Sequence, residues 1–202
     1  MEISGLFEIH ISVDINDIHK FRMFTFNHKM KTIMAVSGYM ETQLMLSKYK
    51  NGTQTECIAK AMLIKQQIEE SGIKVLRTKV ESMGSNKGVP ENENIDRKSY
   101  EYFEYHLKFS VADLEEYKML DHLTTSFDKC TTFVSYNAVK KELVPLVTLR
   151  IVGSNGSIKA NTIKDNFMNY LKSNGFTSNE GIQYEFSVYD DNMRLDDFIV
   201  YE

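Results

Sequence analysis

The chain has 202 residues, of which 42% are hydrophobic and 26% charged, and its formal net charge is −4. This length suits one large domain or two small ones with a buried core, and the composition is that of a globular protein. The negative net charge argues against a dedicated binder of duplex nucleic acid, which would usually be clearly basic.

The two cysteines, Cys57 and Cys130, provide neither a disulfide framework nor the spacing of a metal site. They fit a reducing compartment, so we expect a cytoplasmic protein. The N-terminus lacks a basic segment followed by a long apolar run, and no window approaches the roughly 18 apolar residues of a membrane helix. We therefore expect neither a signal peptide nor a membrane partner.

Six elements are predicted in residues 1–83, in the order strand, helix, strand, strand, helix, strand, over residues 6–14, about 15–28, 31–37, 42–49, 55–71 and 73–81. Asp14 or Asp17 is suited to cap the first helix, and Thr53 or Thr55 the second. Gly72 is suited to end the second helix. This half is predicted to fold as one unit.

Residues 84–99 are polar, contain a proline and have no periodicity, which predicts a linker. Residues 100–202 then repeat the order of six elements, over residues 100–111, 112–123, 131–139, 143–152, 157–175 and 182–190. An acidic tail, residues 190–202, is expected to be solvated and to add at most a short edge strand. The second half is therefore predicted to repeat the plan of the first.

The order β-α-β-β-α-β in each half is that of a ferredoxin-like fold. The motif Phe-Glu-x-His also occurs in the first strand of both halves, at Phe7 and at Phe103, 96 positions apart. We therefore predict an α+β protein formed by internal duplication, with two ferredoxin-like halves and antiparallel sheets.

Alternation in the strands predicts which side chains share a face, because successive residues of a strand point to opposite sides. The predicted polar sets are Glu8, His10, Ser12, Arg77, Lys79 and Glu81 in the first half, and His106, Lys108, Thr148, Arg150, Glu185 and Ser187 in the second. If the two polar faces meet across a cleft, they suit an anionic ligand. Arginine and lysine would compensate its charge, and histidine can transfer a proton near neutral pH.

Two other interpretations stay open. Alternating charges such as Arg77, Lys79 and Glu81 are also typical of ordinary cross-strand ion pairs on a half-exposed sheet, and a strand histidine is often structural. A metal site could use His10, Glu81, His106 and Glu185 as nitrogen and oxygen ligands. The neighbouring Lys79 argues against that site, so we expect neither a metal nor another cofactor.

His10-Ile-Ser-Val fits the pattern His, hydrophobic, Ser or Thr, hydrophobic, and His106-Leu-Lys-Phe fits it except for lysine in the third place. These motifs and the two-lobe plan resemble the two-histidine phosphoesterases. The resemblance implies a metal-independent phosphoesterase in which one histidine is the base and the other the acid. It also implies that Ser12 contacts the phosphate, and Lys108 departs from this pattern.

The predicted function is phosphoester chemistry, or binding of a nucleotide-like anion, in a cleft between the halves. His10 and His106 are the candidate catalytic residues. The candidate ligand-binding residues are Ser12, Arg77, Lys79, Lys108 and Arg150, with Glu81 and Glu185 as accessory candidates. The alternative is a non-catalytic protein that binds a protein partner, or a second copy of itself, through its sheet faces or edges.

Overall fold

The computed structural model describes residues 2–37, 42–94, 96–127, 131–137, 144–153, 155–179 and 181–199. Within these ranges the chain forms four α-helices and one antiparallel sheet of eight strands. The α+β class predicted from the sequence is confirmed. Cys130 and the ends of two predicted strands, at 138–139 and 143, lie outside the described residues.

The helices and strands follow one another in the predicted order: β1 (Ser4–Val13), α1 (Ile18–Asn27), β2 (Lys31–Ser37), β3 (Thr42–Thr53), α2 (Gln54–Glu70), β4 (Val75–Met83), β5 (Phe103–Lys108), α3 (Leu114–Thr125), β6 (Thr131–Asn137), β7 (Leu146–Ile151), α4 (Ser157–Ser173) and β8 (Gln183–Asp190). Two 3₁₀ segments, η1 (Ile15–Asp17) and η2 (Met193–Ile199), complete the chain. The prediction of a short edge strand in the acidic tail is wrong for 193–199, which form η2.

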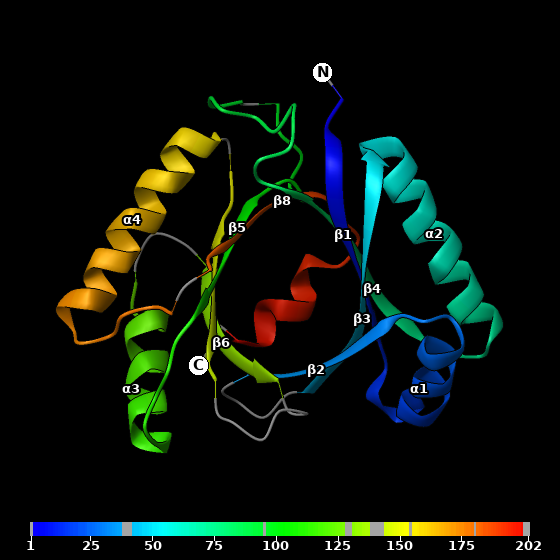
Figure 1. The fold of residues 1–202 in the computed structure, drawn as a ribbon, viewed down its shortest axis with the longest axis horizontal. Coiled ribbons are helices and arrows are strands. Elements are labelled where there is room, and N and C mark those ends of the chain that lie inside the picture. The colour runs from blue at the N-terminus through cyan, green and yellow to red at the C-terminus, as the bar shows by residue number, and fades with distance from the viewer. Residues whose placement is uncertain are drawn as a thin grey trace.

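The eight strands close into a barrel in the order β1-β3-β2-β6-β7-β5-β8-β4 (Figure 1). The first half contributes β4-β1-β3-β2 and the second contributes β8-β5-β7-β6 in the same relative order. The halves are joined by pairing of β4 with β8 and of β2 with β6. The polar faces therefore enclose one barrel interior, instead of opposing each other across a cleft, and no strand of the described sheet has a free edge.

Local sequence signals explain where the helices begin and end. Thr53 accepts a hydrogen bond from the backbone of Glu56, whose side chain accepts one from the backbone of Thr53, and this capping box starts α2. Asp113 caps α3 through the backbone of Glu116. Gly72 follows α2 with a φ of 70°, a conformation that glycine adopts without steric cost.

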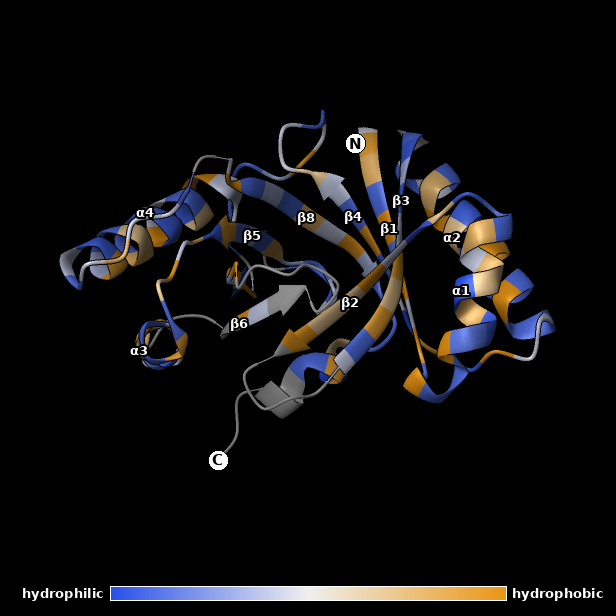
Figure 2. Cartoon of the chain, turned by 60° about the horizontal axis from the view of Figure 1, so that its bottom comes forward, coloured by the Kyte–Doolittle hydropathy of each residue, from blue (hydrophilic) through white to orange (hydrophobic). Residues whose placement is uncertain are grey.

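The hydrophobic core lies between the outside of the barrel and the helices. Figures 1 and 2 show α1 and α2 on one side of the barrel and α3 and α4 on the other. The buried side chains of β1 that face outward are Phe7, Ile9, Ile11 and Val13, and α2 covers the barrel with Cys57, Ala61, Ile64 and Ile68. Because apolar residues of the strands face the helices, the alternate residues fill the interior with polar groups.

The last described segment, η2, is coloured red in Figure 1, where it is seen through the ring of strands; its Asp196 is buried against Arg77 of β4 and Arg150 of β7. Among the described helices, none is both long and apolar enough to cross a membrane. Charged side chains of both halves of the chain meet in the barrel interior and at η2.

Candidate functional site

Strand pairing aligns the polar residues of each half as the sequence predicted. In the pairing of β1 with β4, Glu8 lies opposite Glu81, His10 opposite Lys79, and Ser12 opposite Arg77. In the second half, Glu104 of β5 lies opposite Arg150 of β7 and opposite Glu185 of β8, while His106 lies opposite Thr148. The two histidines thus occupy the same position on β1 and β5.

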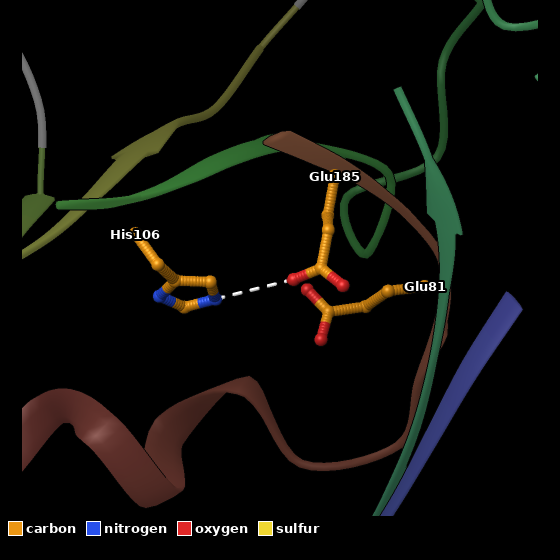
Figure 3. Close-up of side chains that lie close together, drawn as sticks. All are labelled: Glu81, His106 and Glu185. Carbon is orange, nitrogen blue, oxygen red and sulfur yellow. Dashed lines mark ion pairs between the residues drawn. The ribbon is translucent and has the colours of Figure 1, made fainter. Parts of the chain in front are cut away.

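Each histidine lies against a buried carboxylate. His10 Nε2 is 3.3 Å from Glu81 Oε2 and 3.6 Å from Glu8 Oε1. His106 Nε2 is 3.2 Å from Glu185 Oε2, the ion pair drawn in Figure 3, and its Nδ1 is 3.0 Å from the Thr148 hydroxyl. The two histidine side chains are 18% and 19% exposed, so both are partly buried.

The two carboxylates that bind the histidines lie close to each other. Figure 3 shows Glu81 and Glu185 extending side by side from β4 and β8 toward His106, and one ligand atom from each of these three residues lies within 4.8 Å of the others. Burial and the negative charge of Glu81 raise the pKa of Glu185. Burial acts in the same direction on Glu81, but Lys79 and His10 outweigh it and lower the pKa of Glu81. The pKa values of the two neighbouring carboxylates are therefore shifted in opposite directions.

The carboxylates also favour the protonated form of both imidazoles. Burial opposes the charge of His106, but the hydrogen bond to Glu185 and the charges of Glu104 and Glu185 prevail and raise its pKa to about 9. Burial also opposes the charge of His10, yet Glu81 and Glu8 raise the pKa of His10. The positive charge of Lys79 acts against protonation of His10. Both imidazoles are thus favoured in the protonated form, and Lys79 acts against this form at His10.

Three buried cations lie among these residues. Lys79 Nζ is 2.6 Å from Glu81 Oε1 and also bonds Glu104. Arg150 Nη2 is 3.3 Å from Glu104 Oε1. Arg77 donates from Nε and Nη2 to the two oxygens of Asp190, at 2.9 and 2.5 Å. These contacts link both halves of the barrel into one ionic network.

The acidic tail differs from its prediction as a solvated segment. Asp191 is exposed, but Asp190 and Asp196 are buried. Asp196 Oδ2 accepts hydrogen bonds from Arg77 Nη1 at 2.7 Å and from Arg150 Nη2 at 2.6 Å. The reason is that the chain turns back into the barrel after β8, where the two guanidinium groups compensate the cost of burying the carboxylate.

The triplet Glu81, His106 and Glu185 has the ligand types that a divalent transition metal prefers. The same groups, however, already have internal cationic partners. Lys79 neutralises Glu81, and the protonated His106 neutralises Glu185. A metal ion would have to displace a proton and compete with an ammonium group, so the arrangement favours acid–base chemistry over a dedicated metal centre.

The structure brings all of the sequence-predicted site residues except one into the barrel interior. The barrel interior is lined by both histidines and by Ser12, Arg77, Lys79, Arg150, Glu81 and Glu185. Lys108, in contrast, is exposed at the end of β5. Arg77, Lys79 and Glu81 are almost fully buried, so the interpretation of ordinary pairing on a half-exposed surface does not describe them.

Several interior residues were not among the candidate site residues named from the sequence. Glu8 and Glu104 share the histidine face and stand in the repeated Phe-Glu-x-His motif, so a signal for both was present. Tyr102 donates to Asp190, and its ring centre lies 4.5 Å from the guanidinium carbon of Arg150. It precedes β5 but lies within the predicted strand 100–111, two residues before Glu104, so the alternation placed it on the histidine face.

The sequence matches no protein-family model and no curated protein. The function is therefore argued from the geometry of the barrel interior.

Proposed function

We propose that the barrel interior binds a small phosphorylated anion, such as a nucleotide, and that His10 and His106 transfer protons in the cleavage of a phosphoester. The observation that carries this proposal is the convergence of two histidine–carboxylate pairs from β1 and β5 beside three buried cations. Cations bind the phosphoryl oxygens, and the histidines serve the attacking and leaving groups.

We propose a different role for each histidine, supported by the charges that surround it. His106 is the general acid, because Glu185 and Glu104 keep its imidazole protonated. His10 is the general base in the fraction of molecules in which its imidazole is neutral: Glu81 and Glu8 raise its pKa, and the charge of Lys79 opposes its protonation. In the reaction, neutral His10 accepts a proton from water or a neighbouring ribose hydroxyl, whose oxygen bonds to phosphorus. The bond from phosphorus to the leaving oxygen breaks, and His106 donates its proton to that oxygen.

The test is cleavage of 2′,3′-cyclic, 3′,5′-cyclic and 2′-5′ linked nucleotides by the full chain with a chelator present. His10→Gln and His106→Gln remove proton transfer but keep a hydrogen-bonding side chain. Each is expected to lower turnover by about 10²–10⁴-fold, the usual contribution of general acid–base catalysis. His122→Gln is the matched control, since His122 is exposed on α3.

Turnover that is equally lost in the His122 variant would reflect damage to the fold and not to the site. Activity that survives both substitutions would refute the histidine mechanism. Activity that appears only when Mn²⁺ replaces the chelator would assign Glu81, His106 and Glu185 to metal binding instead.

The alternative function is non-catalytic binding of a partner. It is supported by two apolar side chains one turn apart on α1, Met23 and Phe26, which are among the most exposed hydrophobic residues described. Binding of nucleotide without turnover, together with a complex disrupted by Phe26→Ser, would favour this role.

We further infer that the two halves arose by duplication and that the chain resembles the two-histidine phosphoesterases in mechanism. The equal strand order within the halves and the matching places of His10 and His106 support this inference. A sequence profile built from relatives of residues 1–83 is expected to match residues 100–202. Cell fractionation is expected to recover the protein in the cytoplasm.

A further inference from the structure

The C-terminal segment η2 makes the contacts that an anionic ligand would make in the barrel. Asp196 Oδ2 lies 2.7 Å from Arg77 Nη1 on β4 and 2.6 Å from Arg150 Nη2 on β7. From β3, the amide of Gln43 donates to Asp196 Oδ1 at 3.1 Å and to the Leu195 carbonyl at 3.3 Å. The segment is thus bound by three strands that belong to different parts of the barrel wall.

We propose that η2 occupies the anion site of the barrel when no ligand is bound. The Asp196 carboxylate then takes the place of an anionic group of the ligand, so the docked segment and the bound ligand exclude each other. This inference rests on the proposed function and adds a means of regulating the same site.

The first argument is that both arginines have other carboxylate partners. Arg77 is bound by Asp190 through two hydrogen bonds, and Arg150 is bound by Glu104. Asp196 is therefore an additional anion, held by donor groups from two guanidiniums that meet at one oxygen. Such convergence of guanidinium donors is the arrangement by which arginine recognises phosphate and carboxylate oxygens.

The second argument is charge balance in the part of the barrel that the structure describes. The buried charged side chains there comprise three cations and six carboxylates: Arg77, Lys79 and Arg150, and Glu8, Glu81, Glu104, Glu185, Asp190 and Asp196. With both histidines protonated, the cations balance the five carboxylates that belong to the strands. Asp196 is then the excess negative charge, and an incoming anionic group can replace it without changing the balance.

The third argument is that η2 is built to leave more easily than a strand. It is a 3₁₀ segment that follows β8 after only two residues, and none of the sheet pairings includes it. A 3₁₀ segment has poorer hydrogen-bond geometry than an α-helix and gains little stability of its own. In the part of η2 whose side chains are described, the contacts with the barrel wall include those of Asp196 with the two arginines and those of Gln43 with Leu195 and Asp196.

The experiment combines two measurements on the full-length chain. Titration calorimetry measures binding of inorganic phosphate and of AMP, and hydrogen–deuterium exchange follows the C-terminal peptide that contains residues 193–199. Two variants weaken docking differently: Asp196→Asn removes the charge, and Gln43→Ala removes the amide contacts but keeps every interior charge. Glu115→Gln, an exposed position on α3, controls for the loss of one negative charge.

We expect the probes to bind Asp196→Asn at least about tenfold more tightly than wild type, Gln43→Ala more tightly by a smaller factor, and Glu115→Gln unchanged. We also expect each bound probe to accelerate exchange in residues 193–199 of the wild type. Equal affinity in all four proteins, with unchanged exchange, would overturn the inference while the proposed function stands. Binding by none of the proteins would overturn the proposed function, and the inference with it. If Asp196→Asn does not fold, Gln43→Ala alone decides between these outcomes.

Discussion

The pair formed by His106 and Glu185 makes the stability of the fold depend on pH. The pKa of His106 is raised to about 9 in the folded chain, against 6.5 for an ordinary histidine. Protonated His106 is thus bound more tightly by its surroundings than the neutral form is. Its contribution to stability is fully present below pH 6.5 and is lost as the pH rises through 9.

The size of this contribution follows from the interval between the two pKa values. At about 1.4 kcal/mol for each pKa unit, it corresponds to about 3 kcal/mol of unfolding free energy. The charges of Glu104 and Glu185 supply this energy after burial has been overcome. A change of this size is a large fraction of the stability of an ordinary domain.

The measurement is urea unfolding between pH 6 and pH 9.5 for wild type and His106→Gln. The variant keeps a hydrogen-bond donor beside Glu185 but cannot titrate, so the difference between the two curves isolates His106. We expect wild type to lose about 3 kcal/mol more than His106→Gln over this range. His122→Gln, altered at an exposed histidine, is expected to follow wild type.

Parallel curves for wild type and His106→Gln would refute the argument, because they would show that the protonation of His106 is the same in the folded and unfolded chains. A wild type that gains stability relative to His106→Gln as the pH rises would contradict the sign of the effect, and would mean that the neutral imidazole is the form that Glu185 and Thr148 bind.

Other predictions concern parts of the fold outside the histidine pairs. Thr53→Ala removes the capping box of α2 and is expected to lower the free energy of urea unfolding by about 1 kcal/mol. Arg150→Met leaves Asp196 and Glu104 with fewer partners in a buried network, and a loss of about 3 kcal/mol or more is expected in the same assay. Phe167→Ala, in the core, is expected to cost about 3–5 kcal/mol, whereas Phe26→Ala, at a side chain that is 79% exposed, is expected to change stability by less than about 0.5 kcal/mol. Equal effects of the two phenylalanine variants would contradict the assignment of the core.

Local patterns in the sequence were sufficient for the elements and their faces. Thr53 and Gly72 mark the ends of α2 because capping depends on residues a few positions apart. The alternation around His10 places Glu8 and Ser12 on its face because the pleat of a strand repeats every two residues. These signals act within one element, so they can be seen without the rest of the chain.

The closure of the barrel had no comparable signal. It depends on pairing of β4 with β8 and of β2 with β6, which join residues far apart in the sequence. Alternation predicts that a strand has a polar face, but an open sheet and a closed barrel satisfy that pattern equally. The position of Asp196 was hidden for the same reason, since an acidic tail usually stays in water unless cations elsewhere in the fold bind it.

The charged interior is costly for a fold that has a complete hydrophobic core elsewhere. The core lies between the strands and the helices, so the interior of the barrel could be filled by apolar side chains of similar volume. Replacing buried ion pairs in that way is often neutral or stabilising, and the buried network is therefore weak evidence for stability. The proposed anionic ligand would account for its arrangement: the cations and carboxylates of the strands balance one another, while the additional anion, Asp196, is carried by a segment outside the sheet. If η2 and the ligand exclude each other as proposed, the barrel would exchange an internal anion for an external one without exposing an unpaired charge.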